Sequence, residues 1–425
     1  PSEYLYNQYP VGKLEQIKQW ERRIQEAIDT GYARDVYGQP IYFNQTHGMD
    51  VLGKMIQACE ESANPAYYGN LRNALYQLLN QGPIAQGEYY SGYPGMVNDF
   101  QTYVKDPAYY RVAELINQLF HRYQSYQTPY TREELEFPGV VVKTVQVVSE
   151  GAEAMTRPNV LTTYMGNYNV DLANANPEEQ MEQQQLVEGR VERLHHKSYQ
   201  YIIKVQSAEA KKALVRIFLA PVYNSFGEEI PLTQQRHHFV ELDKFVVELE
   251  QGETIVRRSS LDSSLTVPET QGFKQMIEEV VAAKKGQTVM YVEENQPRCG
   301  IPNRMLLPRG TPEGLKFNLL VMVTDAEKEI LEHFHHQYLY PQMFKQQYQQ
   351  QGSIYQQYKQ VEKEVVVKAD KHYLPTYAQC GLIDGTYPYA RSMGYPFDRP
   401  IHYYGKQAFV TRNMKFVDVV VKHVK

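Results

Sequence analysis

The histidines are the side chains best suited to metal or acid–base chemistry, so their spacing is the first test of function. The sequence contains 12 histidines, and no two are separated by four residues, the spacing that places two side chains on one helix face. Adjacent histidines, as in His195-His196 and His237-His238, point in different directions, so most of them cannot share an ion. Only His333 and His336 have a helix-compatible spacing. They either bind an adventitious zinc ion or are solvated or interfacial histidines.

Other sequence signatures of catalysis are missing. We find no nucleophile elbow, no phosphate-binding loop and no dinucleotide fingerprint. The run Tyr90-Ser91-Gly92-Tyr93-Pro94-Gly95 lacks the lysine of a phosphate loop and is typical of a turn. Glu228 and Glu229 lie in a turn, where we expect solvated carboxylates. We therefore predict no catalytic residue, no metal ligand and no cofactor, and hence no enzyme.

Length, charge and composition exclude several classes of protein. The 425 residues are enough for two or three domains. A formal net charge of −5 gives no basic footprint, so we expect no nucleic-acid partner. No apolar run is long enough for membrane insertion. The 36 tyrosines against one tryptophan suit a reservoir of aromatic amino acids, although rings packed in cores and subunit interfaces would give the same count.

The hydrophobic period changes near residue 135. Helical spacing predicts helices over 12–28, 51–59, 71–79 and 106–123, so residues up to about 130 are helical. After Phe137-Pro138 the pattern becomes β-branched or alternating, and it predicts the short strands of an antiparallel sandwich. These strands are 140–148, 199–205, 213–223, 239–249, 254–258, 289–293, 317–323 and 415–424.

Two stretches interrupt this pattern. Residues 167–188 contain a Glu/Gln run, and we expect a surface excursion there. Residues 326–377 are rich in Gln and Tyr, which cannot build a dry core. This second stretch is either a linker or partly disordered loop, or an inserted helical arm followed by a strand over 365–368.

Two helical stretches each carry a recognisable motif. They are Tyr68-Gly69-Asn70-Leu71-Arg72-Asn73-Ala74-Leu75-Tyr76 and Asp106-Pro107-Ala108-Tyr109-Tyr110-Arg111-Val112-Ala113. Together they resemble the second copper site of arthropod hemocyanins and phenoloxidases, in which these helices supply three histidine ligands. The three ligand positions fall on Arg72, Tyr76 and Ala113. Arginine is a permanent cation, tyrosine is a poor copper ligand near neutral pH, and alanine has no ligand atom. The resemblance therefore implies a degenerate copper site.

Motifs in the second part of the chain resemble the third, immunoglobulin-like domain of the same superfamily. They are Val215–Pro221, Glu241–Phe245, Leu261–Ser264 and Tyr395–Ile401, and they recur in the family's order. The resemblance implies an α+β fold. Residues 1–135 correspond to the C-terminal part of the hemocyanin-type second, helical domain. Residues 136–425 correspond to an immunoglobulin-like antiparallel β-sandwich with a Gln/Tyr-rich insertion at about 326–377.

A hemocyanin-like chain that lacks copper ligands resembles the insect hexamerins, also called arylphorins or larval storage proteins. This resemblance implies a secreted hemolymph protein that serves as an amino-acid reservoir, assembles as a homo- or hetero-hexamer and is later stored in fat body after uptake by a receptor. The alternative function is carriage of small hydrophobic ligands such as hormones or flavins. The ligand substitutions argue against a third function, a copper oxygen carrier or phenoloxidase.

The resemblance also implies an N-terminal domain and a first copper site before Trp20. The helices that carry Leu71 and Val112 would have packed against that domain, and leaving their apolar faces wet costs about 25 cal/mol per Å². We therefore expect this chain to be the C-terminal product of an internally cleaved hexamerin, bound without a covalent link to its N-terminal fragment inside a hexamer. The alternative is an uncut subunit of which this sequence is one part.

The sequence contains a single N-glycosylation sequon, Asn44-Gln45-Thr46. It lies between a strand-like run and a predicted helix. We therefore expect Asn44 to be exposed and to carry a sugar in protein from its natural source.

The three cysteines generate a prediction about covalent links. Cys299-Gly300 and Cys380-Gly381 match half of a double disulfide pattern in the third domain of hemocyanins, which implies a bond between these two cysteines. Cys59 shares the predicted helix face of Met55 and Ile56, so we expect it to be a buried free thiol. A non-reducing digest should yield one linked peptide pair containing Cys299 and Cys380. A linked peptide containing Cys59 would contradict this pairing.

Overall fold

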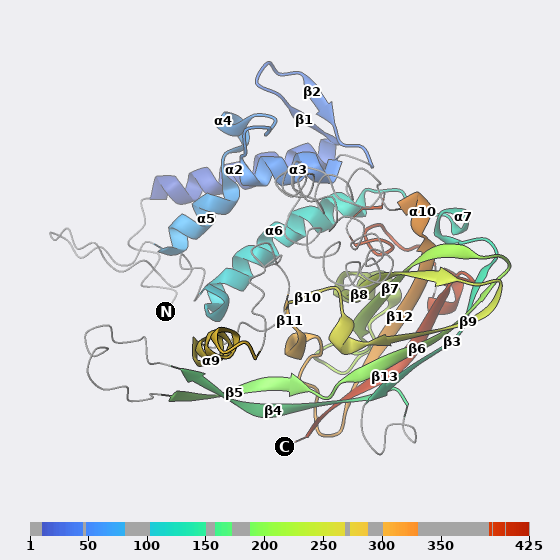
Figure 1. The fold of residues 1–425 in the computed structure, drawn as a ribbon. Coiled ribbons are helices and arrows are strands. Elements are labelled where there is room, and N and C mark those ends of the chain that lie inside the picture. The colour runs from blue at the N-terminus through green and yellow to red at the C-terminus, as the bar shows by residue number, and fades with distance from the viewer. Residues whose placement is uncertain are drawn as a thin grey trace, which may run out of the picture. The chain divides into compact units, whose positions relative to one another are not determined.

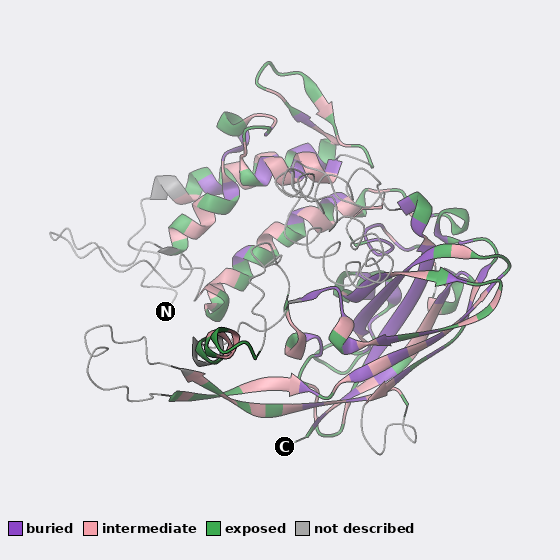
Figure 2. Ribbon diagram, viewed as in Figure 1, coloured by how far each residue is buried: buried purple, intermediate pink, exposed green. Residues whose placement is uncertain are grey.

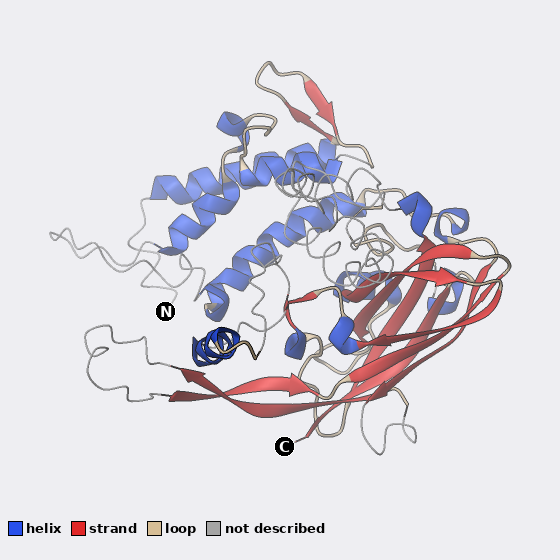
Figure 3. Ribbon diagram, in the orientation of Figure 1, coloured by secondary structure: helices blue, strands red, loops and turns tan. Residues whose placement is uncertain are grey.

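A computed structural model describes residues 11–45, 48–80, 103–149, 158–171, 188–267, 273–287, 301–329, 391–392, 394–403 and 405–424. The chain divides into two units, whose elements are labelled in Figure 1. The first comprises residues 1–130 with 398–400, and the second residues 131–397 with 401–425. Helices dominate the first unit and strands the second (Figure 3), so the fold is α+β, as the sequence predicts.

The first unit packs its helices around one apolar core. Its elements are α2 (Val11–Thr30), β1 (Tyr32–Arg34), β2 (Pro40–Tyr42), α3 (Gly48–Gln57), α4 (Pro65–Tyr68), α5 (Leu71–Asn80), the 3₁₀ turn η2 (Tyr103–Lys105) and α6 (Pro107–Ser125). The buried core includes Ile24, Leu52, Met55, Leu71 and Leu119. These residues come from all four long helices, and their burial is the main force that holds the unit together.

The end of α3 corrects one expectation about Cys59. The helix ends at Gln57, and Ala58 has a φ of 52°, a left-handed conformation that stops the helix. Cys59 therefore does not share a helix face with Met55 and Ile56, and it is half-buried rather than buried. It is a free thiol in the described part of the chain.

The second unit is a sandwich of two sheets. One sheet has six strands in the order β5 (Glu188–His196), β4 (Val160–Asp171), β13 (Met414–Val424), β12 (Leu315–Asp325), β7 (Lys211–Pro221) and β8 (Val240–Leu249). The other has three strands, β3 (Val140–Ser149), β6 (Tyr199–Ser207) and β9 (Gly252–Ser259). A short parallel pair, β10 (Thr266–Val267) and β11 (Ile301–Pro302), stands apart. The helical elements are α7 (Arg132–Leu135), α8 (Leu232–Gln235), η4 (Arg236–His238), η5 (Ser260–Asp262), α9 (Phe273–Lys284), η6 (Asn303–Met305), α10 (Ala326–Glu329) and α15 (Lys406–Phe409).

The central strands β7 and β12 are buried along almost their whole length, as Figure 2 shows. Alternate residues of each strand, such as Ile217 and Leu319, pack against the three-stranded sheet in the main core. The opposite face carries a layer of phenylalanine rings, with Phe239 stacked on Phe397 at 4.0 Å between ring centroids and Phe397 at 5.3 Å from Phe218. Burial on both faces accounts for the nearly continuous apolar sequence of these strands.

The six-stranded sheet differs from the sequence-based expectation in two ways. β13 pairs with β4 in parallel, so the sandwich is not wholly antiparallel. Residues 160–171 and 188–196 form the hairpin strands β4 and β5, so both ends of the predicted surface excursion over 167–188 are strand instead. These strands escaped prediction because residues 164–170 and 188–195 include no buried residue, so they lack the alternating apolar pattern of a strand that packs on a core. Between the two strands, the Arg193 guanidinium lies 3.4 Å from the Tyr168 ring centroid.

Several predicted features lie outside the described residues. They are the strand over 289–293, the possible zinc pair His333/His336, both cysteines of the expected disulfide, and all but the first four residues of the Gln/Tyr-rich insertion at 326–377. Those first four residues form α10.

Gly69 lies at a point where the backbone of the first unit has no room for a side chain. Its φ is 72°, and a Cβ atom there would overlap the indole ring of Trp20. Gly69 separates α4 from α5, so this close approach sets the position at which α5 begins. The Tyr-Gly-Asn motif of the sequence therefore has a structural cause.

We predict that Gly69→Ala destabilises the first unit, by about 1–3 kcal/mol from backbone strain alone and by more if the indole must move. Trp20 is the only tryptophan, so its fluorescence during denaturant unfolding reports on this unit. Gly53→Ala is the matched control, because Gly53 lies inside α3 and an added methyl group there would meet no other atom within 4 Å. Alanine at this position should stabilise α3 by up to about 1 kcal/mol. Equal midpoints for Gly69→Ala and the unaltered chain would contradict the prediction.

Candidate functional site

The three positions that the resemblance assigns to copper ligands lie on two helices whose first turns are capped by side chains. The Asn70 Oδ1 accepts the Asn73 N–H at 3.1 Å at the start of α5. The Asp106 Oδ1 accepts the Ala108 N–H at 2.9 Å at the start of α6, where Pro107 fills the first helical position. Both arrangements satisfy backbone donors that a helix start leaves free. The two sequence motifs therefore define helix starts whether or not a metal binds.

Arg72 and Tyr76 lie one turn apart on α5 and contact each other. The exposed Arg72 guanidinium donates to the Gln57 Oε1 at 2.9 Å and lies 5.7 Å from the centroid of the Tyr76 ring. Tyr76 in turn stacks on Tyr109 of α6, with ring centroids 6.2 Å apart and planes inclined by 25°. The cation–π contact attracts Arg72 to the Tyr76 ring within α5. The stacking of Tyr76 on Tyr109 joins α5 to α6.

Ala113, the third of the positions compared with copper ligands, takes no part in these side-chain contacts. It lies on α6 one turn after Tyr109 and is exposed. Its methyl group offers neither a ligand atom nor a hydrogen bond.

Sequence reasoning missed that four tyrosines gather at this site. The tyrosine cluster consists of Tyr76, Tyr103, Tyr109 and Tyr110, and Tyr109 is its centre, with ring centroids 4.5 Å from Tyr103 and 5.3 Å from Tyr110. Burial raises the pKa of Tyr109 above its ordinary value, and neighbouring Tyr103 raises it further. The Tyr109-Tyr110 pair was visible in the sequence, but its contact with Tyr103 depends on how η2 packs against α6.

The residues at this site do not fit copper. Copper in such sites binds neutral imidazole nitrogens, and the three positions offer a guanidinium, a phenol and a methyl group. Residues 1–130 contain only His47 and His121, and neither occupies a ligand position. Across the described ranges, no three His, Cys, Asp or Glu side chains are grouped so that they could hold a metal ion.

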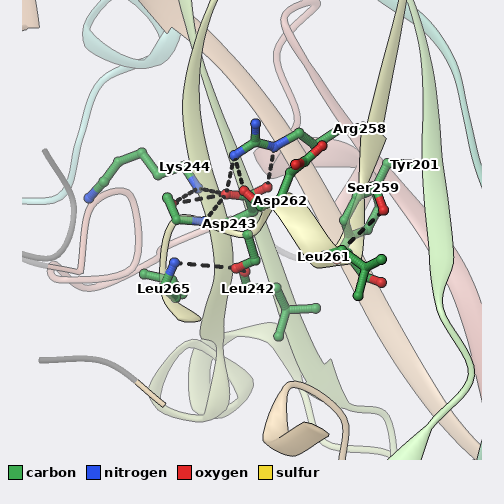
Figure 4. Close-up of polar contacts among 12 residues, drawn as sticks. Tyr201, Leu242, Asp243, Lys244, Arg258, Ser259, Leu261, Asp262 and Leu265 are labelled. Carbon is green, nitrogen blue, oxygen red and sulfur yellow. Dashed lines mark hydrogen bonds and ion pairs between the residues drawn. The ribbon is translucent and has the colours of Figure 1, made fainter. Parts of the chain in front are cut away.

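A second cluster of charged residues lies inside the sandwich, around Asp243 of β8 (Figure 4). The Arg258 Nε donates to the Asp243 Oδ2 at 2.8 Å, and the two side chains are 7% and 1% exposed. The other oxygen, Oδ1, accepts the Ser264 N–H and Oγ–H, each at 2.9 Å, and the Lys244 N–H at 2.8 Å. Ser263 adds a bond to the Leu242 carbonyl at 2.7 Å. This cluster brings together two of the motifs noted in the sequence, 241–245 and 261–264.

The Asp243 cluster is suited to structure rather than to catalysis. Each oxygen of the buried carboxylate already accepts hydrogen bonds, and Arg258 neutralises its charge, so the group is poorly suited to accept a proton from a substrate. Tyr199 and Tyr201 lie nearby in β6, and burial raises the pKa of both phenols well above the ordinary value. The cluster links β8, β9 and the turn after β9.

Asn44, the predicted glycosylation residue, is exposed in the structure. Its backbone carbonyl accepts the Tyr123 hydroxyl at 2.9 Å, which fixes the loop against α6. Whether this residue carries a sugar stays a prediction.

Two parts of the chain match known protein families. Residues 129–423 match the family described as hemocyanin, ig-like domain, and residues 1–120 match the hemocyanin copper containing domain. The chain belongs to the hemocyanin family. Its first unit thus matches a domain named for copper, although Arg72, Tyr76 and Ala113 do not suit that metal.

The relatives of this hemocyanin-family chain include proteins named hemocyanin and a protein named hexamerin. It is 30% identical to the hemocyanin D chain of Aphonopelma sp. over 96% of its own length and 57% of the relative's. It is 31% identical to a hexamerin of Blaberus discoidalis over 97% of its own length and 50% of the relative's. Among solved structures, a scorpion hemocyanin in its activated state has a TM-score of 0.77 at 29% identity and covers 97% of this chain and 58% of that one. The chain spans about half the length of the curated relatives it matches.

We predict that Asp243→Ala destabilises the second unit by about 3–5 kcal/mol, because it leaves the Arg258 guanidinium buried without its partner. Lys204→Ala is the control, since Lys204 pairs with Glu253 at 3.8 Å on the surface and should contribute at most about 1 kcal/mol. Denaturant unfolding followed by circular dichroism in the β region measures both. A loss below about 1 kcal/mol for Asp243→Ala would show that the cluster does not hold the sandwich together.

Proposed function

We propose that this chain belongs to a copper-free, non-enzymatic storage protein of the hexamerin type. The observation that carries the proposal is the composition of the second copper site, where Arg72, Tyr76 and Ala113 stand at the ligand positions. An oxygen carrier or phenoloxidase needs a metal at this place, and a storage protein does not. The likeness to a hexamerin supports this choice within the family.

The electrostatics of the site support the same choice. Arg72 places a permanent positive charge beside Tyr76, one turn along the same helix. Two unit charges 4 Å apart repel by about 1 kcal/mol even in bulk water, and by more near a protein surface. The site therefore lacks ligands for a copper ion and also opposes its approach.

A storage role needs no active site, because its value lies in composition, solubility and assembly. The chain has 36 tyrosines and 15 phenylalanines, so degradation would release many aromatic amino acids. None of the helices in the described ranges is both long and apolar enough to cross a membrane. We include in the proposal secretion to hemolymph, a sugar on Asn44, assembly with other subunits as a hexamer, and later uptake into fat body by a receptor.

We predict that the unaltered chain retains no stoichiometric copper after incubation with Cu(I) and removal of unbound metal, and that it does not oxidise a catechol. The triple variant Arg72→His, Tyr76→His, Ala113→His should gain about one copper ion per chain, because it restores three imidazoles on the two helices. Elemental analysis of the desalted protein measures the metal, and an oxygen electrode measures the oxidation.

The control for this experiment is the variant Lys18→His, Arg22→His. It places two histidines four residues apart on the exposed face of α2, away from the copper positions. The control should retain less copper than the triple variant, since it supplies two imidazoles instead of three. Copper near one ion per unaltered chain would overturn the proposed function.

A further inference from the structure

The tyrosine cluster on α6 and η2 has a geometry suited to oxidative coupling. The rings of Tyr103 and Tyr109 are 4.5 Å apart between centroids and inclined by 56°. Because the ring centroids are this close, the two phenol rings are in contact, and little movement is needed to bring an ortho carbon of each ring together.

Other tyrosine pairs in the described residues are less suited to this reaction. The rings of Tyr32 and Tyr42 are 5.8 Å apart, and the Tyr32 hydroxyl accepts a bond from Arg34. Tyr67 contacts Tyr68 at 4.9 Å, but Tyr68 is buried and its hydroxyl accepts the Arg34 N–H at 2.9 Å. Tyr199 and Tyr201 are fully buried in the sandwich, out of reach of an oxidant.

Tyr110 gives the cluster a point of access from solvent. Its side chain is 57% exposed, and its ring lies 5.3 Å from that of the half-buried Tyr109. Its hydroxyl donates to the Val104 carbonyl at 2.7 Å, which ties α6 to η2, the turn that carries Tyr103. A radical formed on Tyr110 therefore lies next to Tyr109, and Tyr109 in turn contacts Tyr103.

We propose that Tyr103 and Tyr109 are a modification site, at which an intramolecular dityrosine bond forms when the protein meets hydrogen peroxide and a peroxidase. Each phenol loses one electron and one proton, and the two radicals join through an ortho carbon of each ring. The two ring hydrogens displaced at those carbons move to the phenol oxygens, so the net loss is two hydrogens. Peroxide accepts the two electrons and two protons and becomes two molecules of water.

Proximity makes this coupling faster than coupling between chains. Two groups held in contact react as if each were present at very high concentration, whereas exposed tyrosines on separate molecules must first meet. The bond would fix η2 to α6 and add a covalent link beside the former metal site. The inference does not depend on the storage role, because it concerns only ring geometry and access.

The test treats the full chain, at high dilution, with a haem peroxidase and limiting hydrogen peroxide. Trypsin cleaves after Lys105, so Tyr103 and Tyr109 fall in different peptides, and the bond joins the peptide ending at Lys105 to Asp106–Arg111 with the loss of two hydrogens. Fragment ions identify the joined tyrosines, and dityrosine fluorescence follows the rate. Tyr103→Phe keeps the ring and should reduce the joined peptide to below about a tenth of the unaltered yield.

Tyr42→Phe is the matched control, because it removes a hydroxyl from the more exposed Tyr32–Tyr42 pair and should leave the joined peptide unchanged. Circular dichroism of both variants checks that the fold is kept. A Tyr103–Tyr109 bond that disappears in Tyr103→Phe supports the proposal. A bond that joins Tyr32 to Tyr42, joins Tyr109 to Tyr76 or Tyr110 instead, or forms only between chains would overturn it.

Discussion

Burial of the central strands β7 and β12 on both faces is the constraint on which the second unit depends. A strand covered on both sides has no solvated face for polar side chains, so every charged group on it needs a partner. Arg216 of β7 is such a group. Its guanidinium donates to the Thr324 hydroxyl at 2.8 Å and to the Glu329 carboxylate at 2.6 Å, and both ionic side chains are 4% exposed. Arg391 adds a second bond to Glu329 at 3.2 Å.

This pairing and the Asp243 cluster follow the same rule. In each, a buried carboxylate is neutralised by an arginine and further satisfied by neighbouring groups. Removal of water makes each pair costly to form and costly to break, so such pairs specify one arrangement more than they add net stability. The two motifs around Asp243 meet because the turn after β9 presents Ser264 to β8.

In the first unit, the contacts that hold the helices together do not involve a metal. The caps of α5 and α6, the glycine beside Trp20 and the apolar core keep the helices in place. None of these contacts requires a metal. The three positions that the resemblance assigns to copper ligands carry a cation, a phenol and a methyl group, and the stacked rings of Tyr76 and Tyr109 join α5 to α6.

The sequence by itself determined the four long helices of the first unit and most of the sandwich strands, because long runs with one hydrophobic period leave little choice of secondary structure. It also showed that Arg72, Tyr76 and Ala113 carry no imidazole, since the atoms that a side chain can offer to a metal depend on residue type alone. The β4–β5 hairpin, the parallel pairing of β13 with β4 and the contact of Tyr103 with Tyr109 were decided only by tertiary structure. The two strand pairings join residues that are distant in the sequence, and the contact of Tyr103 with Tyr109 depends on how η2 packs against α6. Local pattern carries no signal of such pairings, because their energy comes from contacts that exist only after the chain has folded.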